Sequence, residues 1–143
     1  MFRSQKKYFM FSSEIKIRVR YAETDRMGYA YYGNYATYFE VARVEALREM
    51  GMTYKEMEDE GIILPVLEYY IKFSKPAFYD DLLTIRTVIN NMPGARIRFD
   101  YETFNEKNIL LNIANTTLVF INKNNNKPCA APPYFTEHIK KYF

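Results

Sequence analysis

The chain has 143 residues, the usual size of one domain and enough to bury a core without disulfides or metals. Hydrophobic residues make up 48% and charged residues 26%, as in ordinary globular proteins. The net charge of +3 comes from scattered Lys and Arg rather than a basic stripe, which argues against a nucleic-acid partner. The single cysteine, Cys129, excludes an internal disulfide and favours a reducing compartment.

The two ends of the chain are expected to be tails, over residues 1–13 and 134–143, with a short helix over 136–142. The first tail lacks the apolar stretch of about 7–15 residues that a signal peptide needs. No run of the sequence approaches the roughly 20 apolar residues of a membrane span. We therefore expect a cytoplasmic protein whose one domain covers residues 14–133.

The domain opens with a strand. Residues 14–22, EIKIRVRYA, alternate between apolar and charged side chains. This period of two is typical of a strand with one buried face, and it places Tyr21 on the inward face.

The period then changes to that of a helix. After a glycine-containing loop over residues 23–33, apolar side chains recur at helical spacing over 34–50. Gly51 is placed to end this long helix, because glycine readily takes the left-handed conformation of a helix C-terminus. A shorter helix is expected over 53–60.

The rest of the domain is dominated by strands, expected over residues 63–73, 82–90, 95–104 and 109–122. Pro65 lies within the first of these strands and cannot donate to a ladder, so this strand is expected to have a free edge or to meet a partner. Short turns join neighbouring strands, which favours antiparallel pairing. The sequence therefore predicts an α+β domain with the long helix on one face of a five-stranded antiparallel sheet.

The pair Thr24-Asp25 lies between the first strand and the long helix. Such a pair is often only the start of a turn or a helix cap. A helix N-terminus, however, offers free N–H groups and a partial positive charge that suit a developing oxyanion. A carboxylate nearby can act as a nucleophile or as a general base toward water, so Asp25 is a candidate for acyl transfer or ester-type hydrolysis.

Several tyrosines surround this carboxylate. Tyr21 is first of all a candidate core aromatic, although its hydroxyl could orient Asp25 or a water molecule. Tyr32 and Gly33 lie at the expected helix start, where their backbone N–H groups could polarise a carbonyl. The tyrosines as a group could line an acyl pocket or fill a subunit interface, since tyrosine is common in both.

The remaining polar residues give weaker signals. Glu40 lies three residues before Arg43, a spacing that favours a surface or interface ion pair. Lys75 and Arg96 could bind phosphates, although such residues are usually a solvated sheet face. With one cysteine and the isolated His138, the sequence offers no metal cluster and no histidine-activated nucleophile.

Residues 20–43, RYAETDRMGYAYYGNYATYFEVAR, resemble the signature of the hotdog-fold acyl-CoA thioesterases, in the 4-hydroxybenzoyl-CoA thioesterase-like family. Residues 75–89, KPAFYDDLLTIRTVI, resemble a second, less specific stretch of that family. The resemblance covers residues 14–133. It implies a hotdog fold, in which the sheet wraps the long helix. It also implies dimers joined edge to edge, often assembled into tetramers, with active sites at the dimer interface.

The resemblance also implies roles for individual residues. Asp25 matches the catalytic aspartate of the family, which acts as nucleophile or general base. Tyr21 matches an aromatic position that is implicated in catalysis in some members. Tyr32 matches a position that is a histidine in one subgroup, and in the 4-hydroxybenzoyl type is a tyrosine whose backbone N–H polarises the thioester carbonyl.

These observations predict hydrolysis of an acyl-CoA thioester without a metal or organic cofactor. The carbonyl would lie against the N–H groups of Tyr32 and Gly33, and the CoA phosphates would lie near Lys75 and Arg96. A hotdog hydratase is a rival, but His138 is wrongly placed for it. A non-catalytic module that binds acyl groups or CoA is the other alternative. The acyl group, the choice between CoA and acyl-carrier protein, and dimer versus tetramer stay open.

Overall fold

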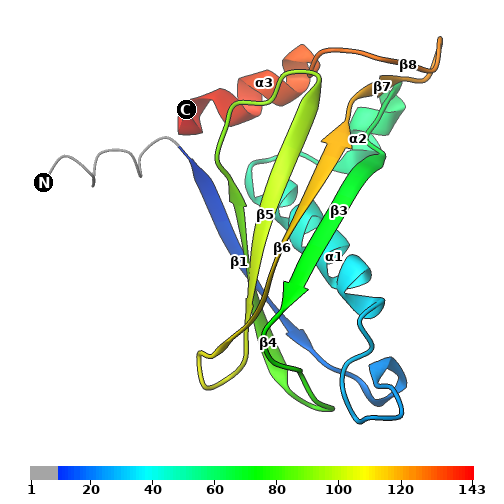
Figure 1. Cartoon of the computed structure of the whole chain (residues 1–143). Helices are drawn as coiled ribbons and strands as arrows, with labels where there is room; N and C mark the ends of the chain where they lie inside the picture. Colours follow the sequence, from blue (N-terminus) through cyan, green and yellow to red (C-terminus); the bar gives the residue numbers. More distant parts are fainter. Residues whose placement is uncertain (1–9) are drawn as a thin grey trace, which may run out of the picture.

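The computed structural model of the chain describes residues 10–143. Its main feature is a five-stranded antiparallel sheet in the order β1-β4-β5-β6-β3, with helix α1 running along one face (Figure 1). This arrangement confirms the predicted α+β domain. Within the described residues, no helix has the length and apolar character needed to cross a membrane.

The strands of the main sheet match the expected segments closely, and they are β1 (Phe11–Arg18), β3 (Val66–Phe73), β4 (Leu82–Ile89), β5 (Arg96–Phe104) and β6 (Leu110–Val119). Along β4 and β5 every second side chain is buried, as the alternating sequence requires. Three two-residue strands, β2 (Ile62–Ile63), β7 (Ile121–Asn122) and β8 (Lys127–Pro128), form a separate small sheet.

Helix α1 (Asn34–Glu49) buries one stripe of its surface against the main sheet. Phe39 in this stripe stacks on Tyr101 of β5, with ring centroids 4.5 Å apart. Ala42 and Ala46 are almost fully buried, so their small side chains let the helix approach the sheet closely. Gly51 follows with a φ angle of +91°, the left-handed conformation expected of a glycine that ends a helix. The shorter helix α2 (Tyr54–Asp59) follows.

The predicted inward position of Tyr21 is wrong. Strand β1 ends at Arg18, and Tyr21–Glu23 form the short 3-10 helix η2, in which Tyr21 is 77% exposed. The cause is Glu23, whose carboxylate accepts hydrogen bonds from the backbone N–H and the guanidinium of Arg20. These bonds turn the chain away from the sheet before Tyr21 is reached.

The expected strand over residues 63–73 is divided at Pro65. Residues on its N-terminal side pair in the small sheet as β2, whereas β3 begins at Val66 and pairs with β6. Pro65 has no N–H to donate, although its carbonyl accepts from the amide of Val119. Strand β3 is the last strand of the main sheet, so the prediction of a free edge is confirmed for the single chain.

The residues set apart as a C-terminal tail contain packed structure. Helix α3 (Pro133–Ile139) and the 3-10 helix η3 (Lys140–Tyr142) follow β8. Phe135 and Ile139 are fully buried, and the Phe135 ring packs edge-on against Phe120 at 5.2 Å. At the other end, β1 already begins at Phe11, within the expected N-terminal tail, while residues 1–9 lie outside the described part.

Candidate active site

A cleft of about 310 Å³ opens where the loop over residues 23–33 meets the N-terminus of α1 and the end of β3. Most of its lining is aromatic or aliphatic, and the polar exceptions are one carboxylate, one amine and hydroxyls. The lining residues are Asp25, Met27, Tyr29, Ala30, Tyr32, Tyr35, Phe73, Ser74, Lys75, Pro76 and Ala77. The cleft therefore joins three of the residues expected from the sequence: Asp25, Tyr32 and Lys75.

The loop holds the Asp25 carboxylate at the cleft through a tight turn. The Asp25 backbone N–H donates to the carbonyl of Tyr29, and its carbonyl accepts from Gly28, whose φ angle is +82°. One carboxylate oxygen, Oδ1, accepts from the amides of Met27 at 2.9 Å and Tyr29 at 3.2 Å. Within residues 10–143 the other oxygen, Oδ2, makes no hydrogen bond. Oδ1 thus stabilises the turn, while Oδ2 stays available for chemistry.

Helix α1 brings its N-terminus to the same cleft. Gly33 is the residue before the first helical turn, and the amides of Tyr32 and Gly33 donate no hydrogen bond to any described residue. A Cβ at Gly33 would come within 2.7 Å of Cε2 of the Tyr31 ring, so a side chain at this position requires the ring to move. Free amides at the positive end of a helix can bind a carbonyl oxygen that gains negative charge.

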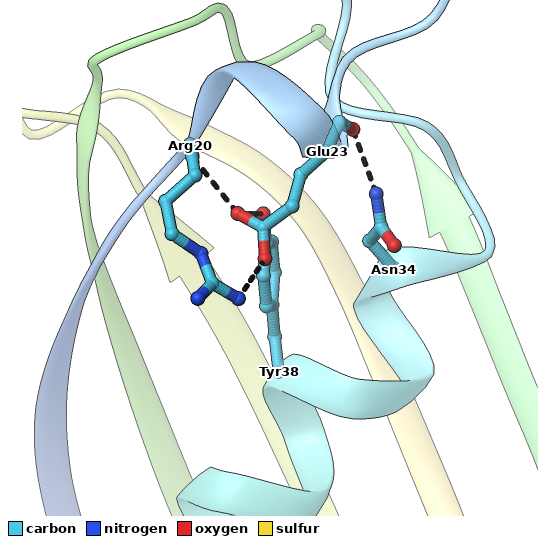
Figure 2. Close-up of polar contacts among 4 residues, drawn as sticks. All are labelled: Arg20, Glu23, Asn34 and Tyr38. Carbon is cyan, nitrogen blue, oxygen red and sulfur yellow. Dashed lines mark hydrogen bonds and ion pairs between the residues drawn. The ribbon is translucent and has the colours of Figure 1, made fainter.

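A hydrogen-bond network around Glu23 fixes the loop to the helix (Figure 2). The Glu23 carboxylate accepts from the Arg20 amide at 2.8 Å, the Arg20 guanidinium at 2.7 Å and the Tyr38 hydroxyl at 2.9 Å. The Glu23 carbonyl accepts from the Asn34 side chain at 2.7 Å and from the Tyr31 amide at 2.8 Å. This residue therefore connects η2 to the first two turns of α1.

The network also sets the protonation of its members. Burial raises the pKa of Glu23, but the hydrogen bonds from Arg20 and Tyr38 and the positive charge of Arg20 lower it by more, so it lies below its ordinary value. Burial and the bond to Glu23 raise the pKa of Tyr38 well above its ordinary value. At neutral pH Glu23 is therefore an anion and Tyr38 a hydrogen-bond donor.

Three of the expected site residues do not line the cleft in the single chain: Tyr21, Gly33 and Arg96. Tyr21 packs its ring edge-on against Tyr79 at 5.6 Å on the surface of the loop region. Arg96 is the first residue of β5 and lines a different hollow, together with Arg98 and Asp100. Lys75 is the basic residue that the structure brings to the cleft.

The expected ion pair between Glu40 and Arg43 is absent from the described part of the chain. Arg43 is only 7% exposed and donates from Nε to the hydroxyl of Tyr54 at 3.2 Å, while Glu40 is exposed. The spacing of three residues permits the pair, but the Arg43 side chain follows the buried stripe of α1 instead.

Sequence reasoning missed Glu23 and the cleft residues Tyr35 and Phe73. The pattern Arg20-x-x-Glu23 was a usable signal, because residues three apart in a helical turn can pair. Phe73 could not be assigned from sequence, since its place depends on how β3 lies against α1. No group of residues able to hold a metal ion occurs within residues 10–143.

Comparison with known proteins gives one consistent result. Residues 19–139 match the family described as the thioesterase-like superfamily. An acyl-CoA thioesterase of Haemophilus influenzae is 30% identical over 117 residues, covering 81% of this chain and 85% of the relative.

Two solved structures are similar over most of the chain. The DHNA-CoA thioesterase of Staphylococcus aureus superimposes with a TM-score of 0.86 at 38% identity, covering 92% of this chain and 89% of that one. A 1,4-dihydroxy-2-naphthoyl-CoA thioesterase from Synechocystis superimposes with a TM-score of 0.81 at 26% identity, covering 92% and 96% of the two chains.

Proposed function

Because this chain belongs to the thioesterase-like superfamily, we propose that its cleft hydrolyses the thioester of an acyl-CoA, with Asp25 as the essential carboxylate. The chain is a thioester hydrolase with the hotdog fold, and acyl-CoA thioesterase activity is supported at the level of the family. The observation that supports the role of Asp25 most directly is that it lines the same cleft as Tyr32, whose backbone amide is free at the start of α1.

In the proposed reaction, the thioester carbonyl oxygen lies against the N–H groups of Tyr32 and Gly33. Asp25 either attacks the carbonyl carbon or removes a proton from a water molecule that attacks it. The bond from carbon to sulfur breaks, the acyl group leaves as a free acid with an oxygen from water, and CoA leaves as a thiol. The amides stabilise the oxyanion formed on the way. No metal or organic cofactor takes part in this scheme.

Lys75 is the candidate for contact with the CoA phosphates, since its exposed side chain stands at the cleft and carries positive charge. Arg96 lines a different hollow, so it would contact the same CoA molecule only from a second copy of the chain or by binding another part of CoA. We also propose that the protein acts in the cytoplasm, which the single free cysteine supports.

We propose that two copies pair through the free edges of β3. Large apolar side chains are exposed on this strand, namely Val66, Leu67, Tyr69, Tyr70 and Phe73, each at least 39% accessible. A two-fold antiparallel pairing in full overlap places Val66 of one copy opposite Phe73 of the other. Phe73 lines the cleft, and Val66 lines a hollow of about 270 Å³ with Thr37, Glu40 and Arg43. The cleft would thereby be completed by the hollow of the second copy.

The first test is thiol release from short-chain, long-chain and aromatic acyl-CoAs by wild type and Asp25→Asn. The amide oxygen of the new side chain can still accept from Met27 and Tyr29, so the turn should survive. Turnover should fall by roughly 100- to 10,000-fold, the usual contribution of a general base. Asp81→Asn is the matched control, because the carboxylate of Asp81 also accepts from a turn amide, that of Phe78, but does not line the cleft.

The two variants separate the alternatives. Loss of turnover in Asp25→Asn alone supports the proposed mechanism. Equal turnover in wild type and Asp25→Asn contradicts it. Binding of CoA or acyl-CoA by wild type with no thiol release from any substrate favours a non-catalytic binding module instead.

A further inference from the structure

The mechanism above leaves one buried charge without a use, the guanidinium of Arg43 on α1. Arg43 is 7% exposed, and an arginine stays positively charged throughout the physiological pH range. Within residues 10–143 its side chain makes one hydrogen bond, from Nε to the hydroxyl of Tyr54 at 3.2 Å, and no ion pair. A guanidinium has five N–H donors, so this one bond leaves most of them unused.

The tyrosines beside this guanidinium, Tyr54 and Tyr101, are neutral and cannot serve as its counter-ion. Burial raises the pKa of Tyr54 to about 12 and also raises the pKa of Tyr101, so both hydroxyls keep their protons at neutral pH. The Tyr101 hydroxyl is already paired with Oγ1 of Thr116 at 2.7 Å. A charge taken out of water is costly unless an opposite charge and hydrogen bonds compensate it, and an anion bound at Arg43 would supply both.

The unused donors of Arg43 are open to such an anion. Arg43 lines the hollow of about 270 Å³ beside β3, and its Nη atoms are not among the fully enclosed unpaired atoms of the described residues. Hydroxyl groups of Thr37 and Tyr69 belong to the same lining. Burial raises the pKa of Tyr69 to about 12, so its hydroxyl is a donor as well. A fork of N–H groups flanked by hydroxyls suits a group that only accepts, such as a carboxylate or a phosphate.

Glu40 is the acidic residue of the hollow and the internal rival for this role. It lies one helical turn before Arg43, but its side chain is exposed and forms no ion pair with Arg43 in the described part of the chain. A hydrated carboxylate at this position lowers the affinity of the hollow for an anion without filling it. Replacing Glu40 is therefore a direct way to separate the two possibilities.

We propose that the hollow around Arg43 is an anion-binding site that takes a carboxylate or a phosphate group. In the pairing of two copies through β3, this hollow adjoins the cleft of the second copy, so the anion is a group of the acyl-CoA bound there. This assignment to the substrate rests on the proposed function, whereas the anion site itself rests on Arg43 and its surroundings. Such a ligand offers two suitable groups, a carboxylate at the far end of the acyl group and a phosphate of CoA.

The anion site is tested without turnover, by the rise in melting temperature with inorganic phosphate or glutarate at constant ionic strength. Wild type should show a rise above that in chloride, because an anion that binds only the folded state stabilises it. Arg43→Met should lose most of the rise. Arg43→Lys should keep part of it, because lysine keeps the charge but lacks the planar fork. Arg86→Met is the matched control, since Arg86 on β4 pairs with Glu102 at 3.2 Å and does not line the hollow. It should rise as wild type does.

Glu40→Gln distinguishes an external anion from an internal one. This variant should bind the probes more tightly than wild type, since it removes a negative charge from the hollow. No rise in wild type together with a clear rise in Glu40→Gln would show that Glu40 is the counter-ion of Arg43 in solution and would overturn the proposal. Equal rises in wild type and Arg43→Met would overturn it as well. If Arg43→Met does not fold, Arg43→Lys provides the same comparison.

The source of the anion is tested by kcat/KM for glutaryl-CoA and for 5-methylhexanoyl-CoA, its neutral counterpart of similar shape. If the acyl carboxylate binds at Arg43, wild type should prefer glutaryl-CoA by about tenfold or more, and Arg43→Lys should reduce this ratio. If a CoA phosphate binds there, Arg43→Lys should lower both values equally, and the loss should disappear with pantetheine thioesters, which carry no phosphate. Equal kinetics of wild type and Arg43→Lys on all these substrates would contradict a substrate group at Arg43.

The failures of this proposal and of the proposed function are distinguishable. Turnover of acyl-CoAs by wild type, with no rise in melting temperature from either probe and no effect of Arg43→Lys, rejects the anion site and leaves the thioesterase mechanism intact. If no thioester is cleaved, the proposed function fails, and the melting temperatures still decide whether Arg43 binds an anion.

Discussion

Glu23 supports the cleft without lining it. Its side chain is only 11% exposed, its carboxylate accepts hydrogen bonds from Arg20 and Tyr38, and its carbonyl accepts one from Asn34 at the start of α1. The loop that carries Asp25 is therefore attached to the helix that carries the free amides. Glu23 is a positioning residue. Its contribution to the stability of the fold can be measured apart from catalysis, because that contribution depends on pH.

Glu23→Gln should lower the free energy of unfolding by about 1–2 kcal/mol at pH 7, because hydrogen bonds to a charged group are lost or weakened. The pKa of Glu23 is depressed in the folded state, so the stability that the carboxylate provides is complete above its unfolded pKa of about 4.5. It is lost as pH falls through the lower, folded pKa. Urea unfolding of both proteins from pH 7 to pH 3 measures this.

The difference between wild type and Glu23→Gln should therefore shrink below about pH 4.5. A difference that stays constant down to pH 3 would show that the charge of Glu23 contributes nothing. Tyr38→Phe is a useful companion, because it removes one of the bonds to the carboxylate and keeps the ion pair with Arg20.

At the scale of elements, the start of α1 depends on a close approach between Gly33 and Tyr31. Gly33→Ala is conformationally allowed, since φ is −65° there, but the added Cβ meets the Tyr31 ring at 2.7 Å. The ring must move, and Tyr31 packs against Tyr32 with centroids 4.5 Å apart. We expect kcat/KM to fall roughly 10- to 100-fold, because small misplacements of catalytic donors are costly.

The double variant Tyr31→Ala/Gly33→Ala shows why kcat/KM falls in Gly33→Ala. If the clash displaces the Tyr32 amide, removing the ring should restore part of the lost kcat/KM relative to Gly33→Ala. Equal activities of the single and double variants, both low, would mean that the side chain at position 33 blocks the substrate directly. Full activity of Gly33→Ala would contradict the role assigned to this helix start.

The elements themselves could be read from the sequence wherever one period dominated. Helix α1 and strands β4 and β5 carry clear helical or alternating patterns, and their observed bounds differ from the expected ones by one residue at most. Tyr21 continued the alternation of β1, but the bonds between Arg20 and Glu23 ended the strand first. Local periodicity contains no information about such a competing turn.

The candidate site was predictable mainly in its sequence-local part, with Lys75 as the exception from a distant segment. Asp25 and Tyr32 lie within one loop and the helix that follows, so a motif can bring them together in the sequence. Phe73 joins the site through the position of β3, whose pairing with β6 links segments that are distant in the sequence. The register of that pairing is a property of the folded sheet.

At the scale of the whole molecule, β3 leaves a row of unpaired backbone groups and apolar side chains at the edge of the sheet. Proteins normally protect such an edge with charges, a cover or a partner. In the described residues β3 carries Glu68 and Lys72, yet Val66, Leu67 and Tyr70 are each at least 46% exposed. A second copy of the same edge would cover these groups and satisfy the backbone.

Leu67→Lys and Tyr70→Lys should convert the proposed dimer to a monomer, because each places a charge on the strand edge that would pair. Sedimentation or light scattering measures the mass, and circular dichroism checks that the fold is kept. Met92→Lys is the matched control, since Met92 is an exposed apolar residue between β4 and β5, outside β3. The Met92→Lys variant should have the same oligomeric mass as wild type.

Catalytic activity should depend on dimer formation if the second copy completes the cleft. Specific activity of wild type should then fall on dilution as dimers dissociate, and the lysine variants should be weakly active at every concentration. A monomeric wild type that cleaves substrate, or a monomeric variant with full turnover, would show that one chain contains the whole site.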